Sequence, residues 1–156
     1  MATQHAVGEA AIRQHIDKLV EAIRAMDLEG VKSIYAPDIV TFDAQAPLQR
    51  VGAEAKRGNW AYAFAAFQRP LGYEIRDLTI TLGGDVAFAH GFARLSGTLK
   101  NGNRMSGRWV RVTFCFRKID GSWLIAHDHT SVVQSSRPQT PAGAAPAAAT
   151  PPKPAS

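Results

Sequence analysis

Apolar residues near the start of the chain recur at intervals of three and four, the spacing that places side chains on one face of a helix. Within residues 9–26 these positions are Ile12, Ile16, Leu19, Val20 and Ile23. The pattern predicts a helix over this stretch. Asp27 can cap a second, shorter helix, "LEGVKSIYA", which Pro37 ends because its ring disfavours helical geometry in the preceding residue.

A third helix is indicated after a brief strand, "DIVTFD", and a loop that contains Pro47. In the stretch "GAEAKRGNWAYAFAAF", Trp60, Phe64 and Phe67 stand at helical spacing, among alanines that permit close packing. We expect this helix to end before Pro70.

After Pro70 the period of the pattern changes from that of a helix to two. Four β-rich runs follow, "LGYEIRDLTITLG", "DVAFAHGFARLSGTLK", "RMSGRWVRVTFCFRKID" and "SWLIAHDHTSVV". They are divided by Gly83-Gly84, Asn101-Gly102 and Asp120-Gly121, which are typical of hairpin turns. Helices followed by long antiparallel strands predict an α+β domain, with the helices gathered on one face of a curved sheet.

The length of 156 residues allows one domain with a sizeable core. We place this domain at residues 8–133, after a flexible N-terminus at residues 1–7. The segment 134–156 holds six of the nine prolines among alanines and small polar residues, a composition that predicts a disordered tail.

Charge and composition narrow the classes of function. The net charge is +5, but Arg137 and Lys153 in the tail supply two of these charges. Positive residues are densest over residues 100–118, without a phosphate loop, a zinc ligand set or an aromatic ladder, so a solvated or interface-facing strand is preferred over nucleic-acid binding. No window approaches the roughly 18 apolar residues of a membrane span, and we expect a cytoplasmic protein. Cys115 is the one cysteine of the chain, which excludes an internal disulfide.

Two longer stretches carry a family resemblance. "AIRAMDLEGVKSIYAPDIVTFD" and "FRKIDGSWLIAHDHTSV" resemble the nuclear transport factor 2-like superfamily. That superfamily includes ketosteroid isomerases, SnoaL-like polyketide cyclases and the association domain of calcium/calmodulin-dependent kinase II. The resemblance spans residues 8–133 and implies a cone: a curved antiparallel sheet with three N-terminal helices packed on its concave face. It does not by itself imply a function, because this fold carries many.

Asp43 falls where the isomerases of this superfamily place the carboxylate that removes a proton next to a carbonyl. The resemblance therefore implies a general base at Asp43, and burial in an apolar pocket favours such a role. The alternative is an aspartate in an exposed turn that accepts hydrogen bonds from nearby backbone amides. The oxyanion donors of those isomerases have no counterpart, since their positions correspond to Leu19 and to Thr113 or Phe114, which argues against steroid isomerisation.

His90 alternates with Phe88, Phe92 and Arg94, so all four are expected on one face of their strand. If that face lines the cone, His90 can relay protons and Phe92 can contact a substrate. Arg94 corresponds to an arginine in the association domain that lines a pocket for small carboxylates, so it is expected to anchor an anionic group. The alternatives are an arginine that neutralises Asp43 or Asp128 and a histidine bonded to the backbone.

The final strand separates its polar residues by face. His127 and His129 share one face, whereas Ala126, Asp128 and Thr130 share the other. A metal site needs at least one further ligand, and none is assigned. We expect the two histidines on the outer surface or at a subunit contact and Asp128 in the pocket, unless a bulge reverses the alternation.

Tyr35, Trp60, Phe64 and Phe67 are interpreted as a helical lid over the cone, with core packing as the alternative to ligand contact.

These observations leave two hypotheses for the function of the domain. The first is a cofactor-independent small-molecule enzyme, an isomerase, dehydratase or cyclase in which Asp43 and His90 transfer protons. The second is a non-catalytic domain that binds a small carboxylate or forms oligomers. In both cases we expect a homodimer through the outer face of the sheet.

Overall fold

The computed structural model describes residues 3–134. The helices are α1 (Gln4–Arg24), α2 (Leu28–Lys32) and α3 (Ala53–Ala65). The strands are β1 (Tyr35–Phe42), β2 (Arg50–Val51), β3 (Gly72–Gly83), β4 (Val86–Thr98), β5 (Arg104–Ser106), β6 (Val110–Ile119) and β7 (Ser122–Ser131). The predicted tail at 134–156 lies almost wholly outside the described residues.

Helix α1 follows the predicted apolar stripe. Its buried side chains are Ile12, Ile16, Leu19 and Ile23. The helix begins at Gln4, earlier than the pattern indicated, because the Thr3 hydroxyl accepts a hydrogen bond from the Ala6 amide and caps the first turn. Residues 4–7, expected to be flexible, are therefore helical.

Helix α2 is shorter than its predicted span and ends at Lys32. Asp27 caps it as expected, with its carboxylate accepting from the Gly30 amide at 3.0 Å. The chain is extended from Tyr35, where β1 begins, and the Ile34 carbonyl just before it accepts a hydrogen bond from the Ile125 amide in β7. Pairing with the sheet ends the helix before Pro37 does.

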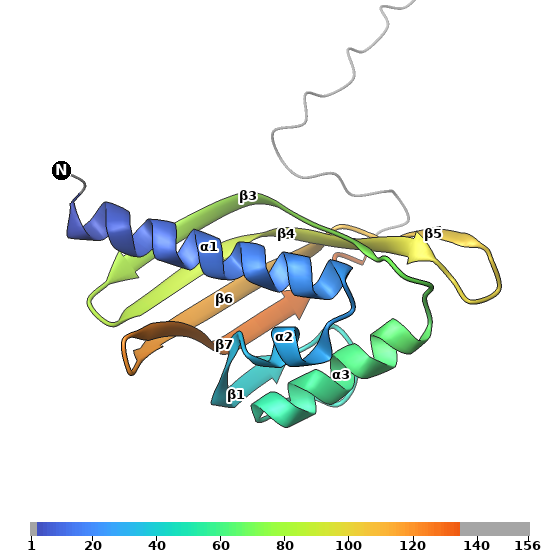
Figure 1. Ribbon diagram of the computed structural model, residues 1–156, viewed down its shortest axis with the longest axis horizontal. Helices are drawn as coiled ribbons and strands as arrows, with labels where there is room; N and C mark the ends of the chain where they lie inside the picture. The colour runs from blue at the N-terminus through green and yellow to red at the C-terminus, as the bar shows by residue number, and fades with distance from the viewer. Residues whose placement is uncertain (1–2, 135–156) are drawn as a thin grey trace, which may run out of the picture.

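The seven strands of the described region form one curved, unclosed sheet in the order β2-β1-β7-β6-β4-β3, with β5 paired to β4. The hairpins are antiparallel, whereas β1 runs parallel to β7, so the sheet is mixed. Helix α1 packs on β3 at one face of the sheet, α2 lies between α1 and α3, and α3 lies next to β1 (Figure 1). The α+β cone expected from the sequence is confirmed.

A bulge in β7 decides which residues face the helices. Cys115 pairs with His127, but the next residue of β6, Phe116, pairs with Ile125, so Ala126 has no partner in this ladder. Before the bulge the odd residues Trp123 and Ile125 are buried, and after it the even residue Asp128 is buried. The extra residue thus turns Asp128 towards the core and both histidines away from it.

Strand β4 buries its small residues rather than its large ones. Ala87, Ala89 and Ala93 face the core, whereas Phe88 is 46% exposed. Alanines on this face allow close packing beneath the helices.

Among residues 3–134, none of the helices combines the length and apolar composition needed to cross a membrane.

Candidate functional site

A cavity of about 770 Å³ lies between the helices and the sheet. Its walls are mainly apolar and include Leu19, Ala63, Phe67, Leu95, Val112 and Phe114. Its polar side chains, among them Asp43, Lys56, Asn59 and Asp128, come from the end of β1, from α3 and from β7. A site of this size and composition can enclose a small organic molecule and orient it through a few polar groups.

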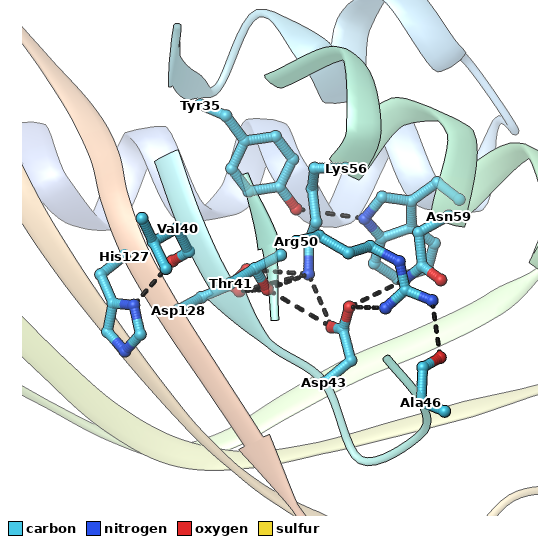
Figure 2. Close-up of polar contacts among 11 residues, drawn as sticks. Tyr35, Val40, Thr41, Asp43, Ala46, Arg50, Lys56, Asn59, His127 and Asp128 are labelled. Atoms are coloured by element: carbon cyan, nitrogen blue, oxygen red, sulfur yellow. Dashed lines mark hydrogen bonds and ion pairs between the residues drawn. The ribbon is translucent and has the colours of Figure 1, made fainter. Parts of the chain in front are cut away.

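Lys56 is the centre of these polar groups (Figure 2). Its side chain is only 4% exposed, and its ammonium donates to Thr41 at 3.0 Å, to Asp43 at 2.9 Å and to Asp128 at 3.2 Å. An ammonium has three N–H groups, so these three acceptors occupy all of them. The lysine is therefore fully bonded within the protein.

Asp43 follows β1 and is held by donors on both oxygens. Oδ1 accepts from Lys56, with the Thr41 hydroxyl at 3.4 Å, and Oδ2 accepts from Arg50 at 2.7 Å and from Asn59 at 3.3 Å. A carboxylate offers about four acceptor sites. Lys56, Arg50 and Asn59 fill three of these sites, since the single hydrogen of the Thr41 hydroxyl is donated to Asp128.

Asp128 is 3% exposed and less completely bonded. Its Oδ1 atom accepts from Lys56 and from the Thr41 hydroxyl, while Oδ2 lies 3.1 Å from the Lys56 ammonium. Burial alone would lower the pKa of Lys56, but the facing charges of Asp128 and Asp43 outweigh it, so its pKa is raised. Lys56 is thus a buried cation, and together with Arg50 it balances the two carboxylates.

Two tyrosines border the same region of the cavity. The Tyr35 hydroxyl accepts from the Trp60 indole at 3.1 Å, and the Trp60 ring packs edge-on against Tyr73 with 6.0 Å between centroids. Burial raises the pKa of both phenols, and the nearby Asp128 carboxylate adds to the shift in each. Both tyrosines are therefore uncharged and keep their hydroxyl hydrogens.

The structure brings together six of the residues that the sequence indicated for the pocket or its lid. They all line the cavity: Tyr35, Asp43, Trp60, Phe67, Arg94 and Asp128. The guanidinium of Arg94 is already engaged, since it donates to Glu74 at 2.5 Å and lies 4.8 Å from the centre of the Trp109 ring. It therefore does not neutralise either aspartate.

Three of the predicted site residues lie elsewhere. His90 is exposed and Phe92 half-buried, on the face of β4 opposite the buried alanines, and neither lines the cavity. Phe64 is buried and packs against Trp60 at 5.6 Å between centroids, behind the lining. The expectation that His90 and Phe92 face the pocket is wrong, because in this part of β4 the alanines face the core, whereas Arg94, further along the strand, does line the cavity.

The histidines of β7 lie on the outer face. The His127 ring bonds to the Val40 carbonyl at 2.6 Å and packs edge-on against Phe42, at a distance from the Lys56 cluster (Figure 2). His129 is exposed and also contacts Phe42. Across residues 3–134, no three His, Cys, Asp or Glu side chains converge as a metal site requires.

Sequence reasoning missed Lys56 and Tyr73. Lys56 stands one helical turn before Trp60, on the same stripe as Phe64. A single charged residue on an apolar stripe is the feature of the sequence that could have indicated a buried lysine. Tyr73 lies at the start of β3, where alternation alone does not distinguish a cavity residue from a core residue.

Comparison with known proteins agrees with this architecture. The chain belongs to the SnoaL-like domain family, which matches residues 12–135. No curated protein sequence gives a significant match.

Solved structures give the same fold. An NTF2-like protein of unknown function from Pseudomonas putida is 31% identical, with a TM-score of 0.73 over 83% of this chain and 89% of that one. A ketosteroid isomerase-like protein from Erwinia carotovora atroseptica is 23% identical, with a TM-score of 0.66 over 81% and 96% of the two chains. The association domain of CaMKII from C. elegans is 17% identical, with a TM-score of 0.66 over 82% and 98%. The nuclear transport factor 2-like fold is therefore established.

Proposed function

We propose that this domain binds a small, largely apolar molecule in its cavity, with an oxygen-bearing end directed at the polar cluster. The observation that carries the proposal is the distribution of side chains in the lining. Apolar walls bury the body of such a molecule at about 25 cal/mol per Å² of apolar surface, and hydrogen-bonding groups at one region fix its direction.

A second function is supported by the position of one carboxylate. Asp128 lines the cavity, and its Oδ2 atom has fewer hydrogen-bond donors than either oxygen of Asp43. A carboxylate oxygen beside a bound carbonyl compound can accept a proton from the neighbouring carbon. We infer that any isomerase, dehydratase or cyclase activity uses Asp128 as the base, while Asp43 holds Lys56 in place. His90 has no part in this proposal.

One experiment separates binding from catalysis. The protein is incubated in D₂O with a panel of cyclic ketones and enones that raise its melting temperature, and exchange of hydrogens next to the carbonyl is followed by proton NMR. Catalysis predicts exchange that Asp128→Asn abolishes and His90→Gln leaves unchanged. If compounds raise the melting temperature but their hydrogens do not exchange, the function is binding without catalysis. If no compound of the panel raises the melting temperature, both the binding proposal and the catalytic proposal are contradicted.

The outer face of the sheet supports a homodimer. Phe42 and Phe88 are 37% and 46% exposed there, beside Cys115 and the histidines of β7. Exposed aromatic residues grouped on one face are typical of association surfaces. We propose that two copies pair through this face and leave both cavities accessible.

A further inference from the structure

Most hydrogen-bond donors at the polar region of the cavity are already used. The three N–H groups of Lys56 contact Thr41, Asp43 and Asp128, the Asn59 amide donates to Asp43, and the Trp60 indole donates to Tyr35. A ligand cannot accept a hydrogen bond from Lys56 or from Trp60 without breaking an existing one, and Asn59 keeps only its second amide hydrogen. Recognition must therefore draw mainly on other donors.

Two phenol hydroxyls supply such donors. The Tyr35 oxygen accepts a hydrogen bond from Trp60, and among residues 3–134 its own hydrogen has no acceptor within bonding distance. The Tyr73 hydroxyl makes no hydrogen bond within the same residues, yet it is not sealed off from solvent, since no buried polar side-chain atom there lacks a partner. Both residues line the cavity, joined through the Trp60 ring.

The charge balance of the cluster limits what these donors can bind. Two cations, Lys56 and Arg50, face two carboxylates, Asp43 and Asp128. An anionic ligand group at this end would add a buried negative charge next to Asp43 and Asp128, whose two cations are already paired with them. A neutral acceptor, such as a carbonyl oxygen, needs only donors.

We propose that Tyr35 and Tyr73 bind the oxygen of an uncharged carbonyl compound, and that ketones rather than carboxylates are the ligand class of this cavity. The inference rests on the proposed binding function and makes it specific. It replaces the expectation of an anionic ligand at Arg94, whose guanidinium is engaged by Glu74 and Trp109.

The test compares ligands that share a skeleton and differ in one group. Binding of 2-acetylnaphthalene, 2-ethylnaphthalene and 2-naphthoate is measured by titration calorimetry, with acetophenone, ethylbenzene and benzoate as a smaller series. We expect each ketone to bind more tightly than the hydrocarbon and the carboxylate of its series. The loss of one neutral hydrogen bond corresponds to about a 2- to 12-fold weakening.

Tyr73→Phe is the informative variant, because its hydroxyl has no partner within the described part of the protein and its removal leaves no donor stranded. We expect it to weaken ketone binding by that factor and to leave hydrocarbon binding unchanged. Ser122→Ala is the control for removal of a hydroxyl, since Ser122 is exposed at the start of β7 and does not line the cavity. Circular dichroism and the melting temperature verify folding of both variants.

Each outcome has a distinct meaning. Carboxylates that bind as tightly as the ketones overturn the inference, as does a Tyr73→Phe variant that weakens ketone and hydrocarbon equally. In both cases ligand binding in the cavity stands. Failure of both series to bind contradicts the proposed binding function itself, and the inference with it.

Discussion

The ammonium of Lys56 on α3 and the carboxylate of Asp128 on β7 meet at 3.1 Å, across 72 positions of the sequence. Both side chains are 4% exposed. This contact joins the helical layer to the sheet at the cavity and sets the charge that a ligand meets there. A buried ion pair of this kind adds little net stability, but removing one partner leaves a buried charge uncompensated.

We expect Lys56→Met to lower the free energy of unfolding by about 3–5 kcal/mol, because it leaves Asp128 buried without its cation. Chemical denaturation of the variant and the wild type measures the difference. Lys32→Met is the matched control, since Lys32 pairs with Glu54 at the surface, and this variant should change stability little.

The double variant Lys56→Met/Asp128→Asn should be more stable than Lys56→Met alone. The second substitution removes the charge that the first one leaves unpaired, so the two effects are not additive. A double variant whose loss equals the sum of the two single losses would show that the two side chains do not interact.

The pH dependence of stability should include a contribution from His15. Its Nε2 atom donates to the Ile34 carbonyl at 3.1 Å. Burial lowers the pKa of His15, partly offset by this hydrogen bond, while the nearby Lys18 charge lowers it further. The unfolded chain therefore binds the proton more readily, and stability should fall as the pH drops below the ordinary histidine pKa of about 6.5.

His15→Gln keeps a donor for Ile34 and removes the titration. Denaturation from pH 7.5 to pH 5 should give a flatter profile for the variant than for the wild type. Parallel profiles would exclude His15 as a source of the pH dependence.

Phe88→Glu should weaken self-association by about tenfold or more, because a symmetric interface would bury the introduced charge twice. Sedimentation velocity at micromolar concentrations measures the effect. Leu48→Glu changes a residue that is 95% exposed, outside the sheet, and should leave association unchanged. A monomeric wild type in the same experiment would exclude the homodimer.

The sequence predicted much of the fold because local patterns determine it. The stripe of Ile12, Ile16, Leu19 and Ile23 predicted helix α1 and its buried face, and the glycine-containing turns predicted the hairpins. Local patterns could not predict the parallel pairing of β1 with β7, since it joins segments that are far apart in the chain.

The candidate site was predicted only in part. Asp43 and Asp128 were identified, but alternation gives two faces without indicating which one is inside. In β4 the small residues are inside, so His90 was assigned to the wrong face. In β7 the bulge at Ala126 changes the alternation within one strand. Lys56 was missed because a lysine on a helix is normally solvated, and only the two facing carboxylates keep it buried.

The state of Lys56 tests the central claim most directly, because a charged lysine is what makes the polar cluster neutral overall. The measurement is a pH titration of the Lys56 side-chain Cε and Nζ signals by NMR, in folded protein labelled with carbon-13 and nitrogen-15. Lys56 should remain protonated at about pH 10.5, where ordinary lysines have lost about half of their protons. A Lys56 that has already lost its proton at this pH would contradict the proposed cluster and the preference for uncharged ligands that follows from it.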